Sequence, residues 1–151
     1  MSQRHTWASS AELMRDYLDK VVADGELALL DHMAHADMVD EANAAFAGPP
    51  GRDGLIAHVK GFRKNVAQPE IRIHEIVGEA SRVMAWWSFS GTHAGPWLGI
   101  EPTHAHFTAN VFSFFALRNG LIERYRLWLQ AELNPPVTFD SRTGELKTLL
   151  N

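Results

Sequence analysis

Two long stretches in which apolar and polar residues alternate, residues 104–118 and 121–133, meet at the dipeptide Asn119-Gly120. An Asn-Gly pair in this setting is the strongest short-range signal for a β-hairpin with a two-residue type I′ turn. In such a hairpin Leu117 faces Ile122, and the pairing continues from there one residue at a time. The chain is therefore expected to contain a long antiparallel pair of strands, which determines the side chains that share a face.

The expected register divides the hairpin into two faces. One face collects long side chains opposite mostly small ones, namely Arg126 with Ser113, Trp128 with Val111, Gln130 with Ala109, and Arg124 with Phe115. The other face collects apolar pairs, namely Phe114 with Tyr125 and Phe112 with Leu127. Long polar tips opposite small residues leave space, so we expect the first face to line a pocket. Both faces are partly apolar, so both are expected to be buried. The helices can bury only one of them, and we expect the second face to contact another subunit.

The first part of the chain has helical spacing instead. Ser9 and Glu12 form a capping-box pattern, and apolar residues recur at helical intervals up to about Gly25. A short helix is expected near residues 26–33, a short strand running into a loop at 36–46, and a third helix capped by Asp53. Further strands are expected at residues 70–78 and 82–91. Helices followed by an antiparallel meander predict an α+β domain over residues 1–136, with an unassigned tail at 137–151.

Composition narrows the function classes. The chain has 151 residues, a net charge of −4 and no cysteine. Without cysteine, disulfides, thiolate catalysis and cysteine-ligated metals are excluded. Nothing suggests a basic surface for nucleic acid, no apolar run approaches a membrane span, and the start lacks the apolar core of a signal peptide. We therefore expect no nucleic-acid or membrane partner, and a cytoplasmic location.

Three segments carry a family resemblance: GPPGRDGLIAHVKGFRKNVAQPEI, RVMAWWSFSGTHAGPWLGIEPT and NGLIERYRLWLQ. They resemble the SnoaL-like polyketide cyclase family, within the nuclear transport factor 2-like superfamily, over roughly residues 37 to 130. The most specific part is Gly91-Thr92-His93, followed by Gly95, Gly99 and Pro102-Thr103. The resemblance implies a cone-shaped curved antiparallel sheet with N-terminal helices enclosing a deep pocket, usually in dimers. It implies cofactor-free acid/base chemistry on polyketide-like or other small hydrophobic substrates, although the fold alone does not decide the reaction.

One position departs from the pattern that the resemblance implies. Cyclases of this family usually carry an acid/base aspartate ten residues after the hairpin glycine, where this chain has Gln130. An amide does not exchange a proton near neutral pH, so the family's acid is missing there. Glu41 is the candidate replacement base, because a carboxylate in an apolar cavity has its pKa raised toward neutrality. The alternatives are a water-facing Glu41, or that Asp37 or Asp40 takes its role.

The remaining candidates follow from their chemistry. Arg126 would bind a developing enolate with Gln130 as a second donor, or would pair with Glu41 without any chemistry. His93 would act as a general acid or base, or would tie down the glycine-rich loop. Substrate-binding walls are expected from Tyr17, Trp87, Ser113 and Trp128. The spacings His104/His106 and His32/His35 allow a metal, but no third ligand is placed, so neither metal nor cofactor is expected.

Two function classes remain. The first is a cofactor-free isomerase, cyclase or lyase that acts on a hydrophobic carbonyl substrate. The second is a non-catalytic binding protein with the same pocket. In both cases the partners are a hydrophobic small molecule and a second copy of the chain, which would form a homodimer through the outer sheet face. A domain used only for dimeric interaction is a third reading.

Overall fold

Helices come first along the chain and strands dominate after residue 65, as the sequence predicts. The computed structural model describes residues 6–149. Its helical segments are α1 (Ser10–Asp16), η1 (Tyr17–Ala23), η2 (Leu27–Leu29), α2 (Leu30–Met33), α3 (Glu41–Ala45) and α4 (Arg52–Asn65). Its strands are β1 (Ala34–Asp40), β2 (Val66–Glu79), β3 (Arg82–His93), β4 (His106–Arg118), β5 (Leu121–Ala131), β6 (Val137–Asp140) and β7 (Glu145–Thr148).

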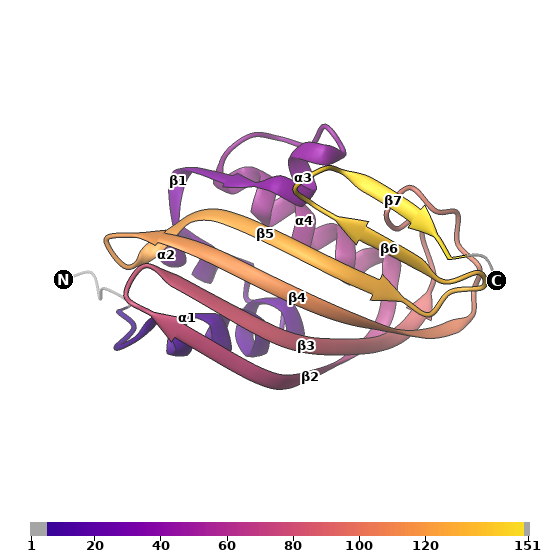
Figure 1. Cartoon of the computed structure of the whole chain (residues 1–151), viewed down its shortest axis with the longest axis horizontal. Helices are drawn as coiled ribbons and strands as arrows, with labels where there is room; N and C mark the ends of the chain where they lie inside the picture. The colour runs from indigo at the N-terminus through magenta and orange to yellow at the C-terminus, as the bar shows by residue number, and fades with distance from the viewer. Residues whose placement is uncertain (1–5, 150–151) are drawn as a thin grey trace.

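The strands form one curved, unclosed sheet, and the helices lie on one of its faces (Figure 1). Neighbouring strands follow the order β2-β3-β4-β5-β6-β7 and pair antiparallel, while β1 pairs with β5 in parallel. The expected α+β class, with N-terminal helices packed against a curved sheet, is confirmed. The core lies between the helices and the concave face of the long strands β3, β4 and β5.

Helix starts are explained by their capping groups. The Ser9 hydroxyl accepts a hydrogen bond from the Glu12 amide at the start of α1, as expected. Asp53 does not cap α4, because the cap residue is Gly51 and Asp53 lies in the first turn. The expected loop after β1 is instead the short helix α3, whose first amides are capped by the Asp40 carboxylate.

The hairpin has the expected turn but not the expected register. Asn119 and Gly120 both have positive φ, at 53° and 78°, as a type I′ turn requires, and Leu117 faces Ile122. A bulge then leaves Glu123 without a facing residue on β4. Ala116 therefore faces Arg124, and every later pair is shifted by one residue. Because a one-residue shift moves side chains to the opposite face, the face assignment predicted beyond the turn is wrong.

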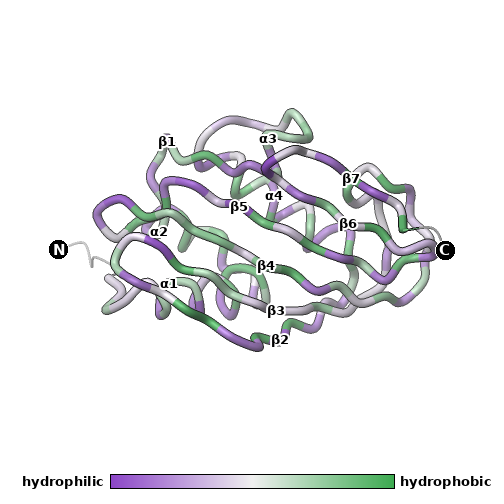
Figure 2. The backbone as a smooth tube through the Cα atoms, viewed as in Figure 1, coloured by the Kyte–Doolittle hydropathy of each residue, from purple (hydrophilic) through white to green (hydrophobic). Residues whose placement is uncertain are grey.

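The shifted register places the apolar residues of β5 inside and its polar residues outside. The inward side chains are Tyr125, Leu127 and Leu129, whereas Arg126, Trp128 and Gln130 lie on the outer face. Figure 2 colours the backbone by hydropathy, and hydrophobic residues recur between hydrophilic ones along β5. The hydrophobic pattern therefore prevails over the register that the turn alone would impose.

Residues after the predicted domain boundary at 136 also join the sheet. Strand β6 pairs with β5, and β7 pairs with β6. Phe139 of β6 is fully buried in the core. In the described part of the chain, none of the helices is both long and apolar enough to cross a membrane.

Candidate functional site

A cavity lies between the helices and the concave face of the sheet. Its volume is about 50 Å³, and most of its wall is apolar or aromatic. The lining residues that carry polar atoms are His58 of α4, Tyr17 of η1, Tyr125 of β5, and the tryptophans Trp87 and Trp97. The cavity therefore brings a small number of polar groups together inside an apolar enclosure, as small-molecule sites do.

The first polar feature is a pair formed by Asp40 and His58. The His58 Nδ1 atom lies 2.7 Å from the Asp40 Oδ2 atom, and the Asp40 side chain is only 1% exposed. An ionised carboxylate can only accept hydrogen bonds, so in the neutral form of His58 the Nδ1 atom carries the proton and the Nε2 atom keeps a free lone pair. Burial alone would lower the pKa of His58, but the charge and hydrogen bond of Asp40 outweigh it and the pKa is raised.

The second polar feature is a chain of hydroxyl groups. Trp87 Nε1 donates to Ser113 Oγ at 2.9 Å, Ser113 Oγ lies 2.8 Å from the Tyr125 hydroxyl, and Tyr125 is hydrogen-bonded to Tyr17. Burial is the main cause that raises the pKa of both phenols, so both keep their protons. Two hydroxyl-to-hydroxyl bonds use two of the three hydroxyl protons. Because Ser113 already accepts from Trp87 and can donate to Tyr125, one phenol proton remains available to a ligand.

The base and the hydroxyl chain are adjacent. The His58 and Tyr125 rings stack with centroids 5.9 Å apart, and both residues line the same cavity. A base next to a buried proton donor is the arrangement needed to remove a proton beside a carbonyl group and to stabilise the resulting enolate. The cavity is therefore equipped for acid/base chemistry without a charged residue other than the Asp40–His58 pair.

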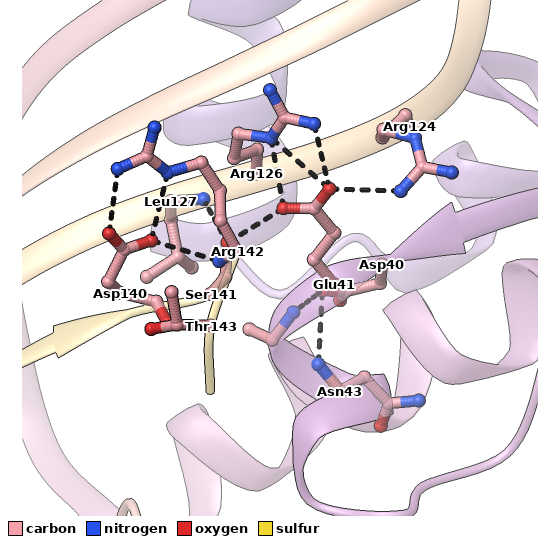
Figure 3. A network of polar contacts seen from close by, with 11 residues as sticks. Asp40, Glu41, Asn43, Arg124, Arg126, Leu127, Asp140, Ser141, Arg142 and Thr143 are labelled. Carbon is pink, nitrogen blue, oxygen red and sulfur yellow. Dashed lines mark hydrogen bonds and ion pairs between the residues drawn. The ribbon is translucent and has the colours of Figure 1, made fainter. Parts of the chain in front are cut away.

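Glu41 lies in a separate network outside this cavity (Figure 3). Its carboxylate accepts from Arg126 Nε at 3.0 Å, Arg124 Nη1 at 2.9 Å and Ser141 Oγ at 3.1 Å. Burial alone would raise the pKa of Glu41, but the hydrogen bonds from Arg126, Arg124 and Ser141 lower it. The expectation of a carboxylate with raised pKa in an apolar cavity is wrong, and the alternative of an Arg126–Glu41 ion pair is what the structure shows.

His93 and Gln130 also lie away from the cavity lining. His93 is fully buried, and its Nδ1 atom is within 3.3 Å of the Thr103 amide and 3.2 Å of the Thr103 hydroxyl. This geometry matches the reading in which His93 ties down the glycine-rich loop. The Gln130 amide donates to Glu132 on the outer face, so its lack of a carboxyl group does not affect the cavity.

Three of the expected substrate-binding residues lie at the cavity. Tyr17 and Trp87 line it and Ser113 supports it, whereas Trp128 is on the outer face. The sequence offers Asp40 as an alternative to Glu41 for the role of the base. It does not identify His58, the hydrogen-bond partner of Asp40. One signal for His58 is available, because it lies three residues after Leu55 and four before Phe62, on the edge of the apolar helix stripe.

Residues 6–149 contain no cluster of three or more histidine, aspartate or glutamate side chains that could hold a metal ion. Within this described range, His58 is the only titratable side chain besides the two phenols that lines the cavity, and Asp40 contacts it from behind the wall. The groups available to a ligand are thus one base, hydroxyls and indoles.

Comparison with known proteins places the fold and site in a family context. A profile described as SnoaL-like polyketide cyclase matches residues 12–131. No curated protein matches in sequence. Among solved structures, TsrD from Streptomyces laurentii is 25% identical with a TM-score of 0.70, covering 86% of this chain and 92% of that one. A SnoaL-like polyketide cyclase from Agrobacterium tumefaciens is 16% identical with a TM-score of 0.61, covering 83% and 92%. An epoxide hydrolase of Mycobacterium tuberculosis, described as LEH-like, is 18% identical with a TM-score of 0.57, covering 78% and 80%.

Proposed function

The chain belongs to the SnoaL-like polyketide cyclase family, and we propose that it is a cofactor-independent acid/base isomerase or cyclase acting on a hydrophobic carbonyl substrate. The observation that carries this proposal is the Asp40–His58 pair, 2.7 Å apart, at the wall of an otherwise apolar cavity. Such a pair provides a base whose tautomer is held by its partner and whose protonated form is stabilised.

In the proposed reaction, His58 Nε2 removes a proton from the carbon next to the substrate carbonyl. The electron pair of that C–H bond moves into the carbonyl group and forms an enolate. The enolate oxygen accepts a hydrogen bond from the phenol hydroxyl of the Tyr17–Tyr125 pair whose proton is free. Asp40 stabilises the imidazolium that forms. Return of the proton to another carbon completes an isomerisation, whereas attack of the enolate carbon on a second carbonyl closes a ring, after which the alkoxide takes the proton from His58.

The test is turnover of cyclisable polyketones and enones, together with exchange of α-protons for deuterium followed by NMR. His58→Gln is expected to lower both rates by about 100-fold or more, since general base catalysis contributes roughly 10²–10⁴-fold. The matched control is His74→Gln, because His74 is exposed on β2, where it contacts Ser88 and Trp86 and does not line the cavity. Binding of these compounds without turnover by the unaltered protein would favour the non-catalytic alternative, and an unchanged rate in His58→Gln would refute the role of His58.

We also propose that the outer sheet face forms a homodimer. Trp86 and Phe112 stack there with centroids 6.2 Å apart, Trp128 packs beside Phe112, and all three are about two-fifths exposed. Large contiguous apolar surfaces of this kind favour association. Phe112→Asp is expected to shift sedimentation from dimer to monomer, whereas Leu146→Asp on β7 is not. A monomer in the unaltered protein would contradict this proposal.

A further inference from the structure

The cavity at the Asp40–His58 pair has a second compartment. A groove of about 170 Å³ lies between α3, α4 and the loop after β3, and it shares Ala42, His58, Phe62, Trp97 and Leu98 with the cavity wall. The cavity of about 50 Å³ is called the inner chamber here, and the groove is called the outer groove. Because His58 lines both, the proposed base lies where the two compartments meet.

Neither compartment carries a fixed charge. Within the described residues, no lysine, arginine, aspartate or glutamate lines either one. The nearest carboxylate partner of the site, Asp40, is already bound to His58 and to the first amides of α3. Arg124 and Arg126 are engaged by Glu41 outside the cavity. The charge of a protonated His58 is already compensated by Asp40, so a charged ligand group would be buried without a further counter-charge, which is costly, and a carboxylate would also be repelled by Asp40.

The volumes limit the size of each part of a ligand. A water-sized group takes roughly 10–15 Å³ of such space, so the inner chamber holds about three to five non-hydrogen atoms. By the same measure the outer groove holds about eleven to seventeen. A carbonyl group with a two-carbon chain fits the first space. A system of up to three fused rings, with about fourteen carbons, fits the second, whereas four linearly fused rings, with about eighteen carbons, exceed both.

The wall of the outer groove also has a hydrogen-bonding group that no contact within the described part of the chain uses. The Asn65 side-chain amide lines this groove and has no hydrogen-bond partner within residues 6–149. Gly95 leaves room for this side chain, because a Cβ atom at position 95 would clash with Asn65 Oδ1. Trp97 gives the groove an aromatic wall and is held edge-on against Phe89 with centroids 5.7 Å apart. An aromatic wall beside a free amide suits a flat ring with a neutral polar substituent.

We propose that the substrate is an uncharged ketone with at most three fused rings, with a short acyl chain in the inner chamber and the ring system in the outer groove against Trp97 and Asn65. This assignment rests on the proposed function for the identity of the reacting group. The size and charge limits rest on the walls of the two compartments alone. It predicts that ligand choice is governed by chain length at one end and by charge and ring number at the other.

The experiment measures binding by tryptophan fluorescence and α-deuterium exchange by NMR for four ketones. Propiophenone and 4-propionylbenzamide are expected to bind, with the benzamide tighter. 4-Propionylbenzoate and 2-propionyltetracene are expected to bind at least 10-fold more weakly, because one is charged and the other has four fused rings. Equal or tighter binding of either would overturn the proposal.

Two variants test the compartments separately. Leu129→Ala enlarges the inner chamber, so valerophenone, which has a longer acyl chain, is expected to gain at least 5-fold in affinity relative to propiophenone. Leu133→Ala is the matched control, because Leu133 is buried but does not line the cavity. Asn65→Leu is expected to remove the preference for 4-propionylbenzamide over propiophenone. An unchanged chain-length preference in a folded Leu129→Ala protein, or an unchanged benzamide preference in Asn65→Leu, would overturn the assignment.

The design separates this inference from the proposed function. If the binding preferences hold and the exchange rate does not depend on His58, the proposed chemistry fails and the ligand class stands. If exchange depends on His58 but the charged or four-ring ketones are preferred, the chemistry stands and the ligand class fails.

Discussion

Asp40 and Glu41 are consecutive carboxylates with opposite surroundings. The Asp40 side chain is 1% exposed and pairs with His58, while the Glu41 side chain is 11% exposed and pairs with Arg124, Arg126 and Ser141. A histidine can release its proton near neutral pH, but a guanidinium cannot. The comparison teaches that burial of a carboxylate does not make a site reactive, because the partner decides whether a proton can move.

The strand-to-helix junction explains why the two side chains diverge. Asp40 ends β1 and caps α3, so its carboxylate turns toward the helix amides and toward α4. Glu41 is the first residue of α3 and reaches across to β5 and to the segment after β6 (Figure 3). Glu41 therefore stabilises the outer side of the β1–α3 junction, while Asp40 lies on its inner side.

The largest expected effect comes from breaking the Asp40 side of this comparison. Asp40→Asn keeps a helix cap, because asparagine caps as well as aspartate, but removes the charge next to His58. The rate of α-deuterium exchange is expected to fall about 100-fold or more. Glu41→Gln is the matched control and is expected to keep the rate within about threefold, provided that the folded fraction is measured by circular dichroism. Equal losses in the two variants would contradict the division of roles.

A smaller effect on the free energy of unfolding is expected on the Glu41 side. Glu41→Gln removes the charge that two arginines share, and we expect a loss of about 1–2 kcal/mol, limited because both arginines are about two-fifths exposed. Glu123→Gln is the control, since Glu123 pairs with Arg118 at 3.9 Å on the exposed surface and should change stability by less than about 0.5 kcal/mol. Urea unfolding measures both. A Glu41→Gln protein as stable as the control would contradict the expectation.

The pH dependence of activity should distinguish the two carboxylates. A base must be neutral to accept a proton, so the exchange rate is expected to rise with pH through the raised pKa of His58. Asp40→Asn removes the charge that raises the pKa of His58. The pH profile of the exchange rate in this variant should therefore move to lower pH, and its maximum rate should fall. Glu41→Gln should leave the midpoint unchanged. A profile that moves with Glu41 and not with Asp40 would reverse the assignment.

The pH dependence of stability should have opposite signs at the two sites. The folded-state pKa of His58 is raised, so its contribution is complete below its unfolded pKa and is lost as pH rises through the folded value. The folded-state pKa of Glu41 is lowered, so its contribution is present above its unfolded pKa and is lost as pH falls through the folded value. Urea unfolding across pH, compared with His58→Gln and Glu41→Gln, would detect each loss. Loss of the Glu41 contribution on the alkaline side would contradict this sign.

The smallest effect is expected at Gln130. Gln130→Asp supplies the carboxyl group that cyclases of this family usually carry at the matching position, but the side chain lies on the outer face and is bonded to Glu132. We expect no gain in cyclisation rate above that of the unaltered protein. A gain of 10-fold or more on a polyketone substrate would show that this position reaches the site after all.

Local sequence signals predicted local structure well. Asn119-Gly120 adopts the type I′ turn because both residues tolerate positive φ. The register beyond the turn was mispredicted because two constraints conflicted, and the bulge at Glu123 resolves them. Inward placement of Tyr125, Leu127 and Leu129 buries apolar surface that the register set by the turn would have exposed.

The sequence by itself determined the order of helices and strands, the hairpin turn and the family, because each of these depends on residue types at short spacing. It also placed Tyr17 and Trp87 correctly at the pocket, since their neighbours repeat at helical and strand periods. Only the tertiary structure decided the partners of the carboxylates. Asp40 and His58 are 18 residues apart on different elements, and Glu41 and Arg126 are 85 apart, so their pairing follows from packing.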